Sequence, residues 1–111
     1  MSMNIVEKVT ICEVGTRDGL QNEKNIISAQ DKAVLIDMMT EAGFKVIEVG
    51  SFVSPKAVPQ MANTDEVFGL IHKKPGVEYR ALIANAKGVD RAVACGCNKV
   101  KLNVSASVAH N

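Results

Sequence analysis

Residues 28–49, SAQDKAVLIDMMTEAGFKVIEV, predict a capped helix followed directly by a buried strand. Ser28, with Asp31 three residues later, is typical of a helix start. Apolar residues then recur at helical spacing, at Val34, Leu35, Met38, Met39 and Ala42. Gly43 suits the position just after a helix, and the apolar run from Lys45 to Val49 is typical of a strand. This stretch therefore predicts one helix–strand unit.

The same alternation of short apolar runs and amphipathic stretches continues along the chain. The expected strands are Val9 to Val14, Lys45 to Val49, Glu78 to Ala84 and Lys99 to Val104. Two further helices are expected, from Asn63 or Thr64 to about Lys73, closed by Pro75-Gly76, and from Lys87 to Cys95. Strands separated by helices pair in parallel with right-handed crossovers, so the class is α/β. Periodicity alone leaves open whether the sheet is doubly wound or part of a barrel.

Composition excludes several classes of protein. The 111 residues are 47% apolar and 23% charged, as in ordinary globular chains, which excludes disordered, collagen-like and coiled-coil structures. The net charge of +1 and the absence of Trp give no reason to expect a nucleic-acid partner. No apolar run is long enough to span a bilayer, and the start, MSMNIVEK, lacks the apolar core of a signal peptide. We therefore expect a cytoplasmic protein with no membrane partner.

The cysteines and glycines show no familiar motif. Cys12, Cys95 and Cys97 are odd in number and lack redox or zinc spacing, so we expect buried or idle thiols. His72, among lysines near a helix end, is expected to be solvated. The glycines of GTRDG lack dinucleotide-binding spacing, and neither GK[ST] nor a GxSxG elbow occurs. Nucleotide binding and nucleophilic hydrolysis are thus disfavoured.

Polar residues gather where the expected strands end, which is the usual site face of α/β folds. Arg17 and Asp18, in Gly15-Thr16-Arg17-Asp18-Gly19, follow the first strand. Glu48 lies inside the apolar run VIEV, where an ionised carboxylate needs a compensating cation, and Arg17 is the natural partner. The direction of the Glu13 side chain stays open. Further polar groups follow the strands at Gln21, Asn22, Glu23, Ser51, Asn85, Asn103, Ser105 and Ser107.

Two stretches resemble a known enzyme family. EVGTRDGLQNEKN, residues 13–25, and IEVGSFVSPKAVPQM, residues 47–61, closely resemble the start of the hydroxymethylglutaryl-CoA lyases. The similarity runs in one register from about Val9 to Ser107. Leu20-Gln21-Asn22-Glu23 after RDG favours the lyases over the related Claisen-condensing synthases, which usually continue with Glu-Gln.

The resemblance implies a metal-dependent (β/α)₈ (TIM) barrel that cleaves 3-hydroxy-3-methylglutaryl-CoA into acetyl-CoA and acetoacetate, a step of leucine catabolism and ketone-body metabolism. It makes Asp18 a ligand of Mg²⁺ or Mn²⁺, Arg17 the positive group at the reacting carbonyl and Glu48 a catalytic-site carboxylate. It also places residues of the substrate pocket at Arg17, Gln21, Ser51, Asn85 and Ser107. The implied partner is an acyl-CoA substrate, and the intact protein is expected to be a homo-oligomer.

The sequence departs from the family pattern at several positions. Thr16 stands where Pro is common, which should alter only loop stiffness, and Val49-Gly50 replaces threonines in a way that could reshape the pocket. Val108 occupies a place where an acidic residue is frequent. The family's histidine pair, a further asparagine ligand and a loop cysteine have no counterpart within these 111 residues.

The chain length fits only part of such a barrel. A complete barrel needs about 250 residues and eight strands, so residues 1–111 are expected to be the N-terminal part of one catalytic domain, with about four strands and three helices. By itself this part is expected to be inactive. Three alternatives remain open: a lyase for a related acyl-CoA, a condensing synthase of the same barrel family, and an inert half-barrel module.

Overall fold

Helix α1 (Ala29–Glu41) begins and ends where the sequence predicts. In the computed structural model, which describes residues 8–103, the Ser28 side chain accepts a hydrogen bond from the Asp31 N–H at 3.1 Å. Gly43, at φ 100°, adopts the left-handed conformation that a side chain disfavours, and the chain turns there towards the next strand. Both ends of the helix are therefore set by local chemistry.

The buried face of α1 differs from the apolar repeat. Val34 and Met38 are exposed, whereas Lys32, Ile36 and Thr40 are buried. Lys32 and Thr40 are buried because their polar ends find hydrogen-bond partners on neighbouring segments. The repeat thus predicts the helix correctly but not the side that packs on the sheet.

The elements alternate as expected. In chain order they are β1 (Cys12–Glu13), the π-helical turn η1 (Gly15–Gly19), α1, β2 (Val46–Phe52), the 3₁₀ turn η2 (Pro59–Met61), α2 (Thr64–Leu70), β3 (Glu78–Ile83), α3 (Ala86–Ala94) and β4 (Lys99–Lys101). The first strand is shorter than Val9 to Val14, because it pairs with β2 only at Cys12 and Glu13 and Val14 already begins the turn η1. Strand β2 runs three residues further than Val49. Val104, the expected end of the last strand, lies outside the described residues.

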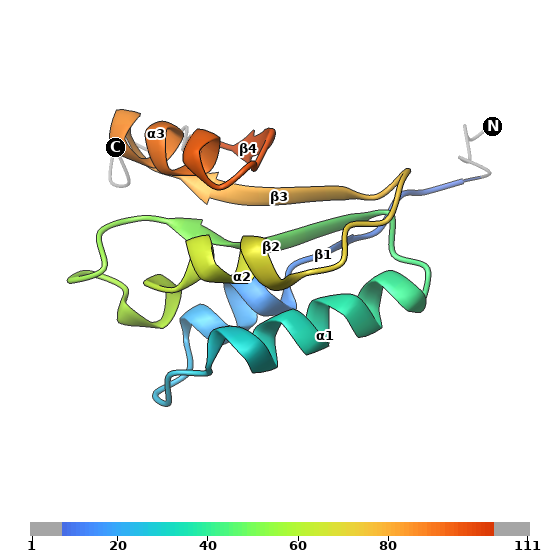
Figure 1. Cartoon of the computed structure of the whole chain (residues 1–111), viewed down its shortest axis with the longest axis horizontal. Helices are drawn as coiled ribbons and strands as arrows, with labels where there is room; N and C mark the ends of the chain where they lie inside the picture. Colours follow the sequence, from blue (N-terminus) through green and yellow to red (C-terminus); the bar gives the residue numbers. More distant parts are fainter. Residues whose placement is uncertain (1–7, 104–111) are drawn as a thin grey trace, which may run out of the picture.

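The strand order separates the two architectures that periodicity left open. The sheet has the order β1-β2-β3-β4, and every neighbouring pair is parallel. A doubly wound sheet reverses its order at a switch point, whereas a barrel adds its strands consecutively. The described sheet follows the barrel order, and its strands lie side by side in Figure 1.

All three helices pack on one face of the sheet. A single core combines Ile36 of α1, Phe68 of α2 and Ala92 of α3 with the strand residues Ile47 and Ala81. In β3 the buried residues alternate with partly exposed ones, as expected when one face meets helices and the other does not. The opposite face is the inner face of the barrel arrangement.

A glycine allows α3 its close approach to the sheet. A Cβ atom added to Gly88 would lie 2.8 Å from the Phe52 carbonyl oxygen and 3.2 Å from Ile83 Cβ.

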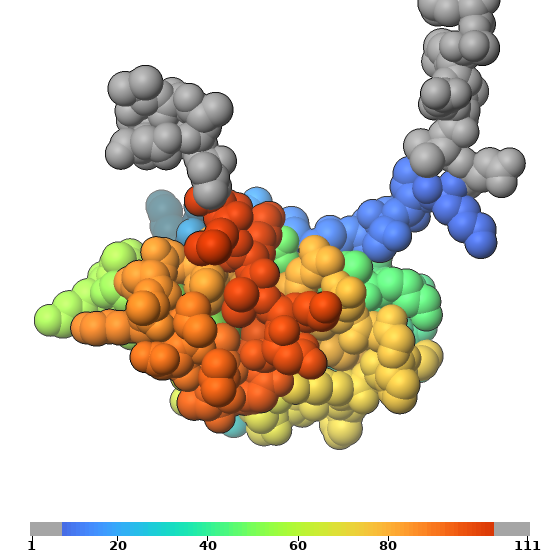
Figure 2. Space-filling view, turned by 90° about the horizontal axis from the view of Figure 1, so that it is seen from above, coloured from blue at the N-terminus to red at the C-terminus, as the bar shows by residue number. Residues whose placement is uncertain are grey.

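Figure 2 shows α3 and β4, in orange and red, over one side of the molecule, and the first described residues, in blue, at its edge. Within residues 8–103 no helix is long and apolar enough to cross a membrane.

Candidate active site

The turn η1 places two charged residues directly after β1. The Val14 carbonyl accepts hydrogen bonds from the N–H groups of Arg17 and Asp18 at 3.1 and 2.7 Å, which winds the chain tightly around it. Glu13, whose direction the sequence left open, accepts the Gly15 N–H on its side chain at 2.8 Å. Glu13 therefore anchors the start of the turn.

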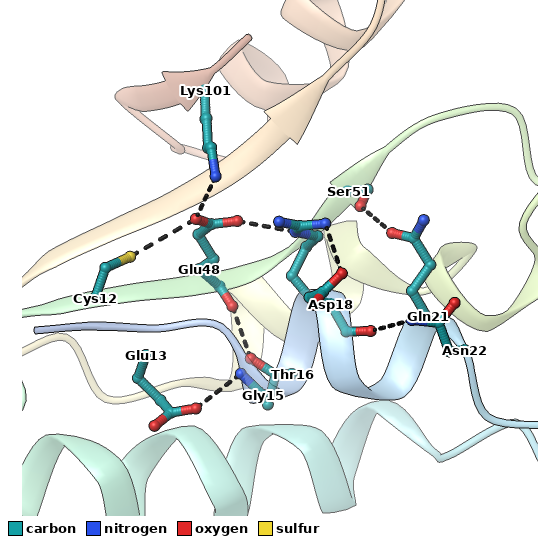
Figure 3. Close-up of polar contacts among 11 residues, drawn as sticks. Cys12, Glu13, Gly15, Thr16, Asp18, Gln21, Asn22, Glu48, Ser51 and Lys101 are labelled. Atoms are coloured by element: carbon teal, nitrogen blue, oxygen red, sulfur yellow. Dashed lines mark hydrogen bonds and ion pairs between the residues drawn. The ribbon is translucent and has the colours of Figure 1, made fainter. Parts of the chain in front are cut away.

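Arg17 of η1 and Glu48 of β2 form a buried ion pair, as the sequence predicts. The Arg17 Nε donates to Glu48 Oε1 at 2.8 Å, and the two side chains are 11% and 2% exposed. The second carboxylate oxygen, Oε2, accepts from Lys101 Nζ at 3.2 Å and from the Cys12 thiol at 3.6 Å. Figure 3 shows Lys101 reaching this oxygen from β4.

These contacts decide the charge of Glu48. Burial alone raises the pKa of this carboxyl, but hydrogen bonds and charge from Arg17 and Lys101 outweigh burial and hold its pKa below the usual value. Burial and the neighbouring Glu48 raise the pKa of the Cys12 thiol. Glu48 is therefore an anion near neutral pH, and Cys12 is a neutral donor to it.

Asp18 lies beside this pair but in a different environment. Its Oδ1 accepts from Arg17 Nη1 at 3.3 Å, while 59% of its side chain is exposed. The Asn22 side chain donates to the Asp18 backbone carbonyl at 2.9 Å and so stabilises the turn that carries Asp18. Asp18 thus offers a carboxylate to solvent next to a guanidinium that Glu48 holds in place.

Thr16 does more than the expected change in loop stiffness. Its hydroxyl, fully buried, donates to the Glu48 backbone carbonyl at 2.8 Å. This bond ties η1 to β2 at the residue that pairs with Arg17. The expectation that Thr16 alters only the stiffness of the loop is therefore wrong.

Gln21 and Ser51 come together at the carboxyl ends of the strands. The Ser51 hydroxyl donates to Gln21 Oε1 at 3.1 Å, and the Ser51 residue is fully buried. This contact joins the segment after β1 to the end of β2. Two residues assigned to the pocket by resemblance are thus in direct contact.

Val49 and Gly50 lie on the other side of the sheet. Val49 belongs to the core beneath the helices, and a Cβ on Gly50 would meet Thr64 Oγ1 at 2.5 Å. The register between β2 and β3 shifts between Glu48 and Gly50, which is typical of a bulge. Val49 therefore faces the core and Gly50 faces α2, and the expectation that this pair reshapes the pocket stays a prediction.

Asn85 has a structural role in the described chain. Its side-chain oxygen accepts the Gly88 N–H at 3.0 Å and caps α3. It also borders an open cavity of about 270 Å³ with Phe52, Lys87 and Arg91. Asn85 is not part of the Arg17–Glu48 contact network. Ser107, Ser105 and Val108 lie outside the described residues.

The described residues show no metal site of their own. Among residues 8–103 no group of three or more His, Cys, Asp and Glu side chains could hold a metal ion. The three cysteines are free thiols, with Cys97 buried, as expected. His72 is largely exposed and contacts Asp37 Oδ2 at 2.7 Å, away from Arg17 and Glu48. Asp18 is the exposed carboxylate that lies beside the buried Arg17–Glu48 pair.

Lys101 is the site residue that sequence reasoning missed. It belongs to a strand that reads Lys-Val-Lys, and such a short charged run resembles a solvated edge. The parallel register pairs Leu82 with Lys101 and Arg80 with both Glu48 and Lys99, so these side chains share the inner face. Only that register, which the sequence does not show, brings Lys101 to Glu48.

Comparison with known proteins gives one consistent result. The HMGL-like family model matches residues 8–111. The 3-hydroxy-3-isohexenylglutaryl-CoA/hydroxy-methylglutaryl-CoA lyase of Pseudomonas aeruginosa is 52% identical over 107 residues, which are 96% of this chain and 36% of that protein. The mitochondrial hydroxymethylglutaryl-CoA lyase of Macaca fascicularis is 56% identical over 107 residues, 96% of this chain and 33% of that protein.

A solved structure agrees with the sequence comparisons. The crystal structure of hydroxymethylglutaryl-CoA lyase from Pseudomonas aeruginosa superposes with a TM-score of 0.93 at 52% identity, over 96% of this chain and 36% of that one. The chain thus spans about a third of the length of these relatives. The described α/β sheet corresponds to the first part of their barrel.

Proposed function

This chain belongs to the HMGL-like family, and from that premise we propose that the whole protein is a carbon–carbon lyase that cleaves 3-hydroxy-3-methylglutaryl-CoA into acetyl-CoA and acetoacetate. The observation that carries the proposal is the buried Arg17–Glu48 pair beside the exposed carboxylate of Asp18. The names of the relatives, which are lyases of this acyl-CoA class, support the choice of reaction.

The proposed reaction needs a fixed positive charge. A proton leaves the tertiary alcohol, the adjacent carbon–carbon bond breaks, and its electron pair passes to the departing acetyl-CoA as an enolate, which is then protonated. Negative charge therefore develops on a carbonyl oxygen in the transition state. Arg17 is proposed to bind that oxygen, since Glu48 holds its guanidinium through Nε and Asp18 contacts Nη1, which leaves Nη2 for another contact.

Asp18 is proposed as a ligand of a divalent cation, Mg²⁺ or Mn²⁺. Its carboxylate oxygens are the hard donors that both ions prefer, and its side chain is open to solvent. Such an ion, when bound, lowers the pKa of the substrate alcohol and orients the bond that breaks. One carboxylate does not make a tight site, so the remaining ligands are proposed to come from the rest of the barrel.

The substrate pocket is proposed to include Gln21 and Ser51, whose mutual hydrogen bond lies next to η1. Asn85 and Ser107 are proposed as further substrate contacts, although the Asn85 oxygen already caps α3. Residues 1–111 are proposed to form the N-terminal part of a single catalytic barrel domain. A cytoplasmic location and a homo-oligomeric state stay predictions, and the macaque relative's name specifies mitochondria.

A second substrate has specific support. The Pseudomonas aeruginosa relative is named for 3-hydroxy-3-isohexenylglutaryl-CoA as well as for hydroxymethylglutaryl-CoA. The two differ only in the group on carbon 3, so both fit the same retro-Claisen chemistry. A lyase for an acyl-CoA with a longer group on carbon 3 is therefore the alternative.

The test uses a complete barrel. Residues 1–111 are joined to the remaining part of the Pseudomonas aeruginosa relative, and this fusion enzyme is assayed with Mg²⁺ or Mn²⁺ for release of acetyl-CoA, the product that both substrates share. Release from 3-hydroxy-3-methylglutaryl-CoA supports the proposal, and a higher kcat/KM for the isohexenyl substrate supports the alternative. Condensation of acetyl-CoA with 2-keto acids, without cleavage of either acyl-CoA, would overturn both.

A further inference from the structure

The carboxylate of Glu48 is shared between two cations, one from the turn after β1 and one from β4. Oε1 accepts from Arg17 Nε at 2.8 Å, and Oε2 accepts from Lys101 Nζ at 3.2 Å. Glu48 is 2% exposed, whereas the Lys101 side chain is 38% exposed. Lys101 therefore connects the buried anion to the open inner face of the sheet.

This sharing restricts how Arg17 binds. A guanidinium and a carboxylate commonly form two parallel hydrogen bonds, since their fork geometries match. Here Arg17 contacts Glu48 through Nε, and its Nη1 turns to Asp18 Oδ1 at 3.3 Å. The other Glu48 oxygen is held by Lys101 and by the Cys12 thiol.

We infer that Lys101 is a positioning residue for Arg17. By holding Glu48 Oε2, Lys101 prevents the guanidinium from closing on both carboxylate oxygens. The terminal nitrogens of Arg17 then remain available for Asp18 and for an anionic oxygen of the substrate. The inference rests on the proposed function in one respect only, that Arg17 binds the oxygen on which charge develops.

The local charges support the same role. Arg17 and Lys101 balance Glu48 and Asp18, whereas without Lys101 one guanidinium would face two carboxylates. Arg80, the register neighbour of Glu48 on β3, is held by Glu78 through two hydrogen bonds at 3.0 and 2.6 Å. Cys12 is a neutral donor and brings no charge. Lys101 is thus the group that completes the balance around Glu48.

The test compares variants of the fusion enzyme. Lys101→Met keeps most of the apolar stem of the side chain but removes its charge, and Lys101→Arg restores a cation. Because Arg17 is proposed to act in the transition state, Lys101→Met is expected to lower kcat about tenfold or more while KM changes less than about threefold. Lys101→Arg is expected to recover kcat to within about threefold of the parent. Lys99→Met, on the same strand and face, is the matched control and is expected to leave kcat within about twofold.

A double-mutant cycle separates positioning from a general structural effect. In an Arg17→Lys background the guanidinium is absent, so adding Lys101→Met is expected to lower kcat by less than about twofold further. An equal loss in both backgrounds, or a kcat for Lys101→Met within about twofold of the parent, would overturn the inference.

Failure of the proposed function gives a different result, because the parent fusion enzyme then cleaves neither acyl-CoA substrate and releases no acetyl-CoA. In that case crystal structures of the parent and of Lys101→Met decide the inference. A second hydrogen bond from Arg17 to Glu48 Oε2 in the variant supports it. An unchanged single contact through Nε contradicts it.

Discussion

Lys32 on α1 donates a hydrogen bond to the side-chain oxygen of Asn63 at 2.7 Å, although the lysine is only 1% exposed. The same ammonium donates to the Gln60 carbonyl, and the Asn63 amide donates to the Ile27 carbonyl at 3.1 Å. The contact therefore ties the segment that follows β1 to the segment that follows β2. The first of these segments contains Gln21, and the second begins just after Ser51 at the end of β2.

Lys32→Met is expected to destabilise the fold. The substitution keeps most of the apolar stem but leaves the Gln60 and Asn63 oxygens without this donor, which costs about 1–3 kcal/mol. The measurement is urea unfolding of the fusion enzyme. Gln30→Met, at an exposed position of the same helix, is the control and should change the unfolding free energy by less than about 0.5 kcal/mol. Equal stability of Lys32→Met and the parent would show that the buried contact contributes nothing.

Glu48 gives the fold a dependence on acidic pH. Its pKa is lowered in the folded chain, so at acidic pH the unfolded chain binds more protons than the folded one. The stability from Glu48 is fully present above the ordinary pKa of a glutamate and is lost as the pH falls through the lower pKa of the folded chain. Glu48→Gln should remove this part of the acid dependence. Unfolding free energies of parent and variant, measured from neutral pH down into the acid range, test this, and parallel pH curves would contradict it.

The sequence predicted the elements better than their contacts. Ser28 and Gly43 bound α1 through local chemistry, so short-range rules were sufficient there. The Arg17–Glu48 pair was also predictable, because a carboxylate inside an apolar strand needs a cation. Lys101 and Lys32 were not predictable. Their partners lie 53 and 31 residues away and are brought close only by the strand register and the packing of α1.

The bulge in β2 decides which face of the sheet Gly50 occupies. Strict alternation along VIEVGS would place Gly50 on the same face as Glu48, but the register shifts between these two residues. Gly50 therefore meets α2, and Ser51 meets Gln21. A bulge leaves little trace in a single sequence, so the facing of Val49 and Gly50 could only come from the structure.

Gly50→Ala tests this placement. An alanine Cβ would lie 2.5 Å from Thr64 Oγ1 and 2.8 Å from Thr64 Cγ2, so α2 must shift, at an expected cost of about 1–3 kcal/mol. Adding Thr64→Ala removes both of these atoms and should recover part of the loss. KM for the acyl-CoA should stay unchanged, because Gly50 does not face the pocket. A raised KM without a loss of stability would show that the residue lines the pocket after all.

Arg17→Gln is expected to impair turnover more than substrate binding. Glutamine can still donate to Glu48, but it brings no charge to the oxygen on which negative charge develops, so kcat should fall by about 10²–10³-fold. Steady-state assays of the fusion enzyme give kcat and KM separately, and circular dichroism checks that the variant is folded. Turnover like that of the parent would remove Arg17 from the proposed chemistry.

Asp18→Asn is expected to weaken binding of the divalent cation and turnover together. The amide keeps the size of the side chain and one oxygen donor but loses the negative charge, which hard cations such as Mn²⁺ require for tight binding. Because Asp18 is 59% exposed, its loss should scarcely alter the stability of the fold, so the effect is separable from misfolding. Calorimetric titration of the fusion enzyme with Mn²⁺ should show an affinity at least about tenfold lower.

Glu23→Gln, which changes an exposed carboxylate in the segment after η1, is the matched control and should bind Mn²⁺ like the parent. Equal Mn²⁺ affinity in Asp18→Asn and the parent would remove Asp18 from the ligand set, whatever happens to turnover.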